Sequence, residues 1–172
     1  MPKRRKYVVY LMRGAPASGK SYAAKKLAGR QGVVCETDSY FGPPGEEYSF
    51  VSKQVPEARA SNMRKFMSAL LHCITPIVVD RGNGKGDRTR WYVQAALDHG
   101  YTVQFAEPVS KQWSNIKKVL IQKAAVDRIL EIWAVVLAKK QKRTHGVEQW
   151  RILKSLKKFD PELTVEKVLE GE

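Results

Sequence analysis

The chain contains few of the features that place a protein in a membrane or cross-link it. No stretch approaches 18 consecutive apolar residues, so the sequence predicts no membrane span. The first apolar run, residues 7–12, is too short for a signal-peptide core, and no small-residue cleavage site follows it. Only two cysteines occur, Cys35 and Cys73, without metal-ligand spacing. We therefore expect a cytoplasmic protein, or a nuclear one in a eukaryote, whose two cysteines are buried thiols.

The chain also lacks internal repeats, low-complexity tracts and linkers long enough to divide it into domains. Its 172 residues fit one domain with a sizeable core. Hydrophobic residues make up 43% and charged residues 28%, which is an ordinary globular balance and argues against extensive disorder. We therefore expect a single domain over residues 1–172.

Acidic residues are scarce relative to basic ones, and the net charge is +14. Residues 1–107 carry 17 Lys and Arg against 9 Asp and Glu, whereas residues 108–160 carry 13 against 4. The last twelve residues reverse the sign, with 1 against 4. A basic surface of this kind favours RNA or DNA as a partner. A basic protein without a polymer partner remains the alternative.

Short apolar segments alternate with amphipathic ones along most of the chain. The apolar segments predict four strands, at residues 7–12, 33–36, 77–80 and 101–106. The amphipathic segments predict helices at residues 20–30, 56–71, 87–99, 111–141 and 147–159. Asp87 is the expected N-cap of the third helix, and Asp160-Pro161 is expected to start a short last element. This order predicts an α/β fold around a mostly parallel sheet, with ligands at the carboxyl ends of the strands.

A phosphate-binding motif follows the first predicted strand. The pattern GxxxxGK[ST] is matched by Gly14, Ala15, Pro16, Ala17, Ser18, Gly19, Lys20 and Ser21. The glycines let backbone N–H groups point at phosphate oxygens, and the next helix adds its positive N-terminal end. Lys20 would contact the β- and γ-phosphates of ATP, and Ser21 would ligate Mg²⁺. A buried strand before the motif and a helix after it meet the structural context that the motif requires.

Carboxylates follow the second and third predicted strands, at the same edge of the sheet. Asp38 could accept the proton of an attacking hydroxyl, and the alternative is that it caps a turn. Asp80 follows three apolar residues, as expected for an acid that holds Mg²⁺. Arg81 and Asn83 could orient a substrate, although a tight Gly-Asn turn explains the same residues.

A basic segment at residues 139–145 ends in a His-Gly break and predicts a mobile cationic lid over residues 139–147. A solvated helix face is the alternative. Trp113 and Trp133 lie in the helical segment 109–138 that precedes this lid. Both are better explained by core packing than by stacking on nucleic-acid bases.

Together these motifs resemble the polynucleotide-kinase-like branch of P-loop kinases. The resemblance rests on RGAPASGKS at residues 13–21, TDSYF at 37–41, VVDRGN at 78–83, GYTVQFAEP at 100–108 and HGV at 145–147. The order and rough spacing agree over residues 7–160. This branch includes the phage polynucleotide 5′-kinases and the ATPase modules of the ubiquitin-ligase-binding protein family.

The resemblance implies a three-layer P-loop NTPase sandwich with five parallel strands in the order 2-3-1-4-5 and a helical lid. It implies Mg²⁺-dependent transfer of the ATP γ-phosphate to a hydroxyl, often the 5′-OH of RNA or DNA. Asp38 would be the general base, and Lys142 or Arg143 would take the place of the lid arginines. The acceptor would be contacted by Asp38, Tyr40, Arg81 and Asn83.

Three departures from the branch concern the acceptor. Phe41 stands where the phage enzymes have an arginine, residues 80–83 differ from the usual DNTN-like run, and the stretch between Pro108 and His145 is longer than expected. Two alternatives therefore stay open. One is a kinase of a small hydroxyl acceptor such as a nucleotide sugar, a nucleoside or an antibiotic. The other is an ATP-gated nucleic-acid-binding module with little turnover.

Overall fold

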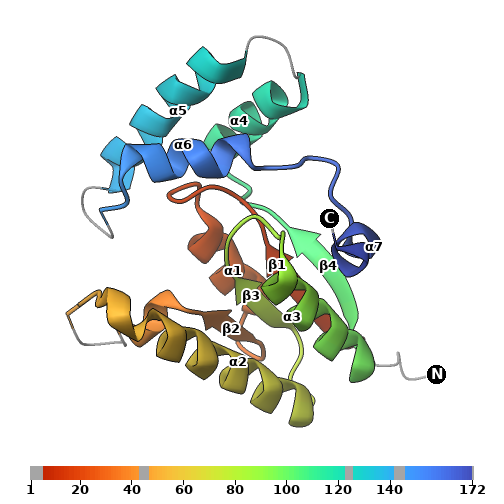
Figure 1. Ribbon diagram of the computed structural model, residues 1–172. Helices are drawn as coiled ribbons and strands as arrows, with labels where there is room; N and C mark the ends of the chain where they lie inside the picture. The colour runs from red at the N-terminus through yellow and green to blue at the C-terminus, as the bar shows by residue number, and fades with distance from the viewer. Residues whose placement is uncertain (1–5, 43–46, 123–125, 142–145, 172) are drawn as a thin grey trace.

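The computed structural model describes residues 6–42, 47–122, 126–141 and 146–171 (Figure 1). A parallel sheet lies at the centre, with helices on both of its faces, and three further helices gather above the carboxyl ends of its strands. The predicted α/β class is therefore confirmed. Within the described ranges, every helix is too short or too polar to span a lipid bilayer.

The sheet is built from the four apolar segments that the sequence predicts as strands. They are β1 (Val8–Met12), β2 (Val33–Glu36), β3 (Ile77–Asp80) and β4 (Thr102–Ala106), all parallel, in the order β2-β3-β1-β4. Asp80 is in register with Met12 on one side and with Glu36 on the other. The carboxyl ends of three strands therefore meet at one edge.

The fifth strand implied by the resemblance is wrong for the described residues. After β4 the chain passes Pro108, which has no backbone N–H for a sheet ladder, and continues as helices. The last of these, α7 (Val165–Glu170), packs against α3 and β4, the edge strand. Its predicted start is also wrong, because Thr164 rather than Asp160 caps it by accepting a hydrogen bond from the Lys167 N–H.

The two faces of the sheet are covered by different helices, because side chains alternate along each strand. On one face, the core packs against α2 (Val55–Leu71), α3 (Asp87–Asp98) and α7. On the other face, Met12 and Val78 pack against the alanines of α1 (Lys20–Ala28). Each fully buried aliphatic or aromatic side chain of this kind contributes about 1.5–3 kcal/mol of transfer free energy.

The helices on the sheet agree with the predicted ones apart from details of their ends. Gly86, not Asp87, is the N-cap of α3, with φ 91°. Asp87 lies in the first turn instead, where its carboxylate is close to the positive end of the helix and 3.5 Å from Arg90. Leu71, the last residue of the amphipathic helix predicted at 56–71, is apolar but exposed at the last turn of α2.

A second hydrophobic core lies between α4 (Lys111–Gln122), α5 (Val126–Gln141) and α6 (Gln149–Lys157). The single long helix predicted over residues 111–141 is therefore two helices that pack against each other. Trp113 is 1% exposed and Trp133 is partly buried, so both belong to this core as expected. Ala15 of the phosphate loop packs into the same core.

The two cysteines differ in burial. Burial of Cys35 inside β2 raises the pKa of its thiol to about 11. The prediction that Cys73 is buried is wrong, because it lies in the turn after α2 with φ 52°, and its side chain is exposed.

Candidate functional site

The loop between β1 and α1 adopts backbone conformations that explain its glycines. Gly14 has φ 141°, and a Cβ there would lie 2.9 Å from Ser18 Oγ and 3.2 Å from Pro108 Cδ. Gly19 is the left-handed N-cap of α1, with φ 100°. Only glycine adopts both conformations without strain, which explains why a glycine stands at each end of the loop.

The side chain of Lys20, in the first turn of α1, reaches back to this loop. Lys20 Nζ donates to the carbonyl oxygens of Gly14 and Ala15, each at 2.8 Å. No side chain of the described residues caps α1, and its first turn contains no acid. The N–H groups of this turn have no intrahelical acceptor, so they are suited to an anion. Burial lowers the pKa of Lys20, and the carboxylates of Asp80 and Asp38 oppose that shift.

Two carboxylates lie at the strand ends beside the loop. Ser21 Oγ donates to Asp80 Oδ2 at 2.7 Å, which joins the two predicted Mg²⁺ ligands directly. Burial raises the pKa of Asp80, while the Ser21 hydrogen bond and the charge of Lys20 lower it. Burial, followed by the charge of Asp80, also raises the pKa of Glu36. This end of the sheet therefore holds closely spaced acids with a buried ammonium beside them.

One cavity of about 330 Å³ connects these groups. It is lined by Gly14, Pro16, Ala17, Lys20, Ser21, Glu36, Thr37, Asp38, Asp80, Arg81, Gly82, Val147 and Ser155. The structure thus brings Lys20, Ser21, Asp38 and Asp80 together from three segments that are distant in the sequence. Asp38 begins the short 3-10 helix η1 (Asp38–Tyr40), and its exposed carboxylate forms no hydrogen bond with the described residues.

The predicted acceptor residues divide into two groups. Asp38 and Arg81 line the cavity, and the Arg81 guanidinium lies 5.8 Å from the centre of the Tyr92 ring. Tyr40 and Asn83 do not line it. Tyr40 is 39% exposed and packs edge-on against Phe41, which is buried. Asn83 lines a neighbouring, larger cavity instead.

Ser155 of α6 also lines the site cavity, and no motif in the sequence identifies it. Asn83 Nδ2 donates to the Ser155 carbonyl oxygen at 2.7 Å and lies 3.2 Å from Ser155 Oγ. The residue type and helical position of Ser155 give no signal, because a serine on an amphipathic helix is usually a solvated residue. Asn83 therefore fixes α6 against the loop that follows β3.

Arg13, immediately before the phosphate loop, is another residue that sequence reasoning did not single out. It is 2% exposed, and its guanidinium lies between the rings of Phe105 and Phe159, at 4.8 and 4.5 Å. It donates to the carbonyl oxygens of Asn83, Asp160 and Leu163. Burial lowers the pKa of Arg13, against the opposing charges of Glu107 and Asp160. Arg13 thus ties the loop to the chain segment that follows α6.

The predicted lid lies only partly within the described residues. Lys142 and Arg143 fall outside them, whereas Val147 lines the site cavity. Among the described residues, no group of three or more His, Cys, Asp and Glu side chains is arranged to hold a metal ion. The Ser21–Asp80 pair fits a Mg²⁺ ion that takes its other ligands from phosphate oxygens and water.

Comparison with known proteins finds a human relative of the chain. No protein-family model matches the chain. The chain is 34% identical over 133 residues to NEDD4-binding protein 2 of Homo sapiens. The match covers 72% of this chain but 7% of that protein, so the chain spans only a small part of its relative's length. The similarity agrees with the resemblance of the motifs to the ubiquitin-ligase-binding protein branch.

Proposed function

We propose that the protein is an ATP-dependent phosphotransferase of the P-loop kinase type, which moves the γ-phosphate to the 5′-OH of RNA or DNA. The observation that carries the proposal is that Lys20, Ser21, Asp38 and Asp80 line one cavity, with Ser21 hydrogen-bonded to Asp80 at 2.7 Å. These are the residue types that phosphoryl transfer to an alcohol requires: a cation, a metal-binding pair and a free carboxylate.

Nucleotide binding is assigned to the loop and to the first turn of α1. Bound Mg²⁺·ATP supplies the phosphoryl group and neutralises the charge that develops on it. The loop N–H groups orient the phosphates, and Lys20 exchanges its hydrogen bonds with the loop carbonyls for phosphate oxygens. Ser21 and Asp80 would hold the metal ion. The fit is supported by the uncapped N-terminus of α1 and by the absence of an acid from its first turn.

Asp38 is assigned to the acceptor hydroxyl. Its exposed carboxylate has no hydrogen bond with the described residues, so it can accept a proton without first losing a partner. Arg81 lines the same cavity and is suited to orient the acceptor, and Lys142 and Arg143 remain the proposed lid cations. Burial lowers the pKa of Arg81, mainly because its guanidinium is partly withdrawn from water.

The net charge of +14 favours a polymeric acceptor over a small one. A small-molecule kinase and an ATP-gated nucleic-acid-binding module remain alternatives that the same site could serve. The name of the relative states that it binds NEDD4. Because the match covers only 7% of that protein, it adds no partner to this proposal.

Incubation with γ-labelled ATP and Mg²⁺ tests the proposal. The acceptor panel contains 5′-OH RNA, 5′-OH DNA, a nucleoside, a nucleotide sugar and an aminoglycoside. We expect label on a polynucleotide. Label only on a small acceptor would favour the second kinase hypothesis. Binding of ATP without label on any acceptor would reject the enzyme in favour of a binding module.

A further inference from the structure

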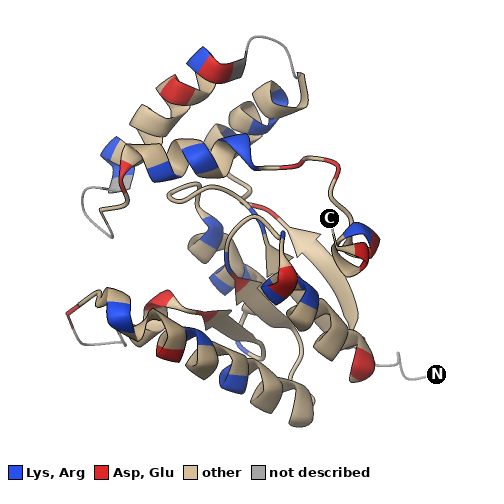
Figure 2. Cartoon of the chain, in the orientation of Figure 1, with Lys and Arg blue, Asp and Glu red and all other residues tan. Residues whose placement is uncertain are grey.

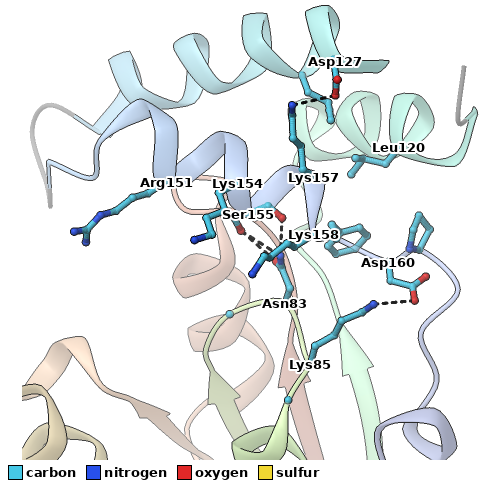
Figure 3. A pocket seen from close by; sticks show the side chains of 15 residues that line it. Asn83, Lys85, Leu120, Asp127, Arg151, Lys154, Ser155, Lys157, Lys158 and Asp160 are labelled. Carbon is cyan, nitrogen blue, oxygen red and sulfur yellow. Dashed lines mark hydrogen bonds and ion pairs between the residues drawn. The ribbon is translucent and has the colours of Figure 1, made fainter. Parts of the chain in front are cut away.

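A second cavity, larger than the site cavity, is an open groove beside it, with a volume of about 1080 Å³. It lies between α6, the loop that follows β3, and the segment that leads away from α6 (Figure 3). Its lining includes five cations against two acids. The cations are Lys85, Arg151, Lys154, Lys157 and Lys158, and the acids are Asp127 and Asp160. We refer to this cavity as the α6 groove.

Ion pairs within the α6 groove leave some of its cations unneutralised. Lys85 lies 3.2 Å from Asp160, and Lys157 lies 3.2 Å from Asp127. Lys154 and Lys158 are exposed and form no ion pair with any described residue. Figure 2 shows that basic residues gather along α6. The groove therefore presents an excess of positive charge that would attract a polyanion.

An exposed indole lies on the same helix as these cations, outside the residues that line the groove. Trp150 is 55% exposed, and its ring lies 5.3 Å from the Arg151 guanidinium and 6.0 Å from Lys154 Nζ. Its Nε1 donates to Glu148 at 2.9 Å, which helps to hold the ring in place. Trp150 and Lys154 of α6 and its C-cap residue Lys158 are spaced four residues apart, so they follow one side of the helix. Bases of single strands stack on an aromatic surface of this kind, while adjacent cations contact the phosphates.

The α6 groove adjoins the site cavity. Gly82 and Ser155 belong to the linings of both. Asn83 holds Ser155 at 2.7 Å, so α6 and the loop after β3 are fixed together at the boundary. A strand that lay along α6 would therefore pass beside the cavity that contains Asp38.

We propose that the α6 groove binds single-stranded nucleic acid, with a base stacked on Trp150 and backbone phosphates at Lys154 and Lys158. A single strand is favoured over a duplex because the bases of a duplex are already stacked on each other and are not free to stack on the indole. That the bound strand is the acceptor of the reaction rests on the proposed function. Binding itself does not depend on the reaction.

The test measures binding without ATP, by fluorescence anisotropy with a labelled single-stranded oligonucleotide of about 12 nucleotides, a length within known single-strand site sizes. Trp150→Ala is expected to weaken binding by roughly tenfold, because it removes one stacked base, and Trp150→Phe should restore most of the affinity. The double variant K154E/K158E should weaken binding at least as much. It should also make the slope of log affinity against log salt shallower by about 1.4, for two phosphate contacts.

The matched control is K111E/K118E, which changes the charge equally at two exposed lysines of α4 outside the groove. Affinity equal to wild type in both groove variants, or an equal loss in the control, would overturn the proposal. Displacement of the oligonucleotide by polyglutamate at equal charge concentration would also overturn it, and would point to an acidic protein partner. Tight binding through α6 without transfer activity would reject the proposed function and support the groove as a binding site.

Discussion

The site cavity and the α6 groove lie side by side but have opposite charge. The cavity contains three carboxylates, Glu36, Asp38 and Asp80, against Lys20 and Arg81, whereas the groove contains five cations against two acids. In the proposed function a divalent cation accompanies the triphosphate in the cavity, because those carboxylates would repel a triphosphate alone. A polynucleotide requires no such ion in the groove. We therefore propose metal-dependent chemistry for the site cavity and salt-sensitive binding for the α6 groove.

The largest effect is expected from Asp38→Asn. Loss of a general base should lower the rate of phosphoryl transfer by roughly 10²–10⁴-fold, while ATP affinity stays nearly unchanged, because Asp38 forms no hydrogen bond with the described residues of the loop. Initial rates and nucleotide titrations measure the two effects separately. Asp98→Asn, at the end of α3 and outside the cavity lining, is the control. Turnover at the wild-type rate would disprove the assignment.

Lys20→Ala should affect both nucleotide affinity and turnover. Charge-assisted hydrogen bonds contribute about 1.5–3 kcal/mol each, so ATP affinity should fall by roughly 10- to 150-fold. Calorimetry with ATP and Mg²⁺ measures the loss. Lys26→Ala, an exposed residue of α1, is the matched control. If ATP bound to the Lys20 variant as tightly as to wild type, the loop would not be the nucleotide site.

Arg13→Met tests how strongly Arg13 holds the loop after β1 to the segment that follows α6. The substitution keeps much of the packing between Phe105 and Phe159 but removes the donors to three carbonyl oxygens. We expect the free energy of unfolding to fall by about 2–4 kcal/mol, measured by urea denaturation. Arg30→Met, at an exposed position after α1, should change it by less than about 0.5 kcal/mol. Equal stability of the two variants would contradict the coupling.

The smallest effect concerns Asp80 and pH. Burial raises the pKa of Asp80, so the folded chain binds more protons than the unfolded chain. The free energy of unfolding therefore falls as the pH rises from the ordinary range of Asp toward the folded value. Asp80→Asn should remove most of this pH dependence and stabilise the metal-free protein at neutral pH. The same variant should bind ATP less tightly in the presence of Mg²⁺.

Urea denaturation at acidic and neutral pH tests this prediction, with Asp98→Asn as the control. Some dependence on pH should remain, because burial and the charge of Asp80 raise the pKa of Glu36 in the wild type. A variant whose stability depends on pH as strongly as that of the wild type would contradict the account of the buried carboxylates.

The strands and the phosphate loop could be predicted because their signals are local. Residues 77–80 are apolar over a short run and end in an acid, which is enough to place both β3 and Asp80. The fifth strand came only from the family resemblance, and the apolar run after Ala106, at residues 132–138, lies inside helix α5. The division of the helical segment at residues 122–126 was missed because residues 123–125 are good helix formers. Local propensity therefore gives no sign that α4 and α5 fold back on each other.

Contacts made across the fold left no sequence signal. Arg13 looks like an ordinary basic residue, yet it is buried between rings from β4 and from the end of α6. Ser155 resembles a solvated helix position, yet it borders both the site cavity and the α6 groove. Such positions depend on which elements pack together, and that arrangement is fixed by the whole chain rather than by a local pattern.

The most direct test compares two labelled reactions that differ only in the group at the 5′ end of the acceptor. Wild-type protein with γ-labelled ATP and Mg²⁺ receives either a single strand with a free 5′-hydroxyl or the same strand already phosphorylated there. We predict label on the first strand and none on the second. Equal incorporation into both, or none into either while ATP remains bound, would contradict the proposal that this cavity transfers phosphate to a 5′ end.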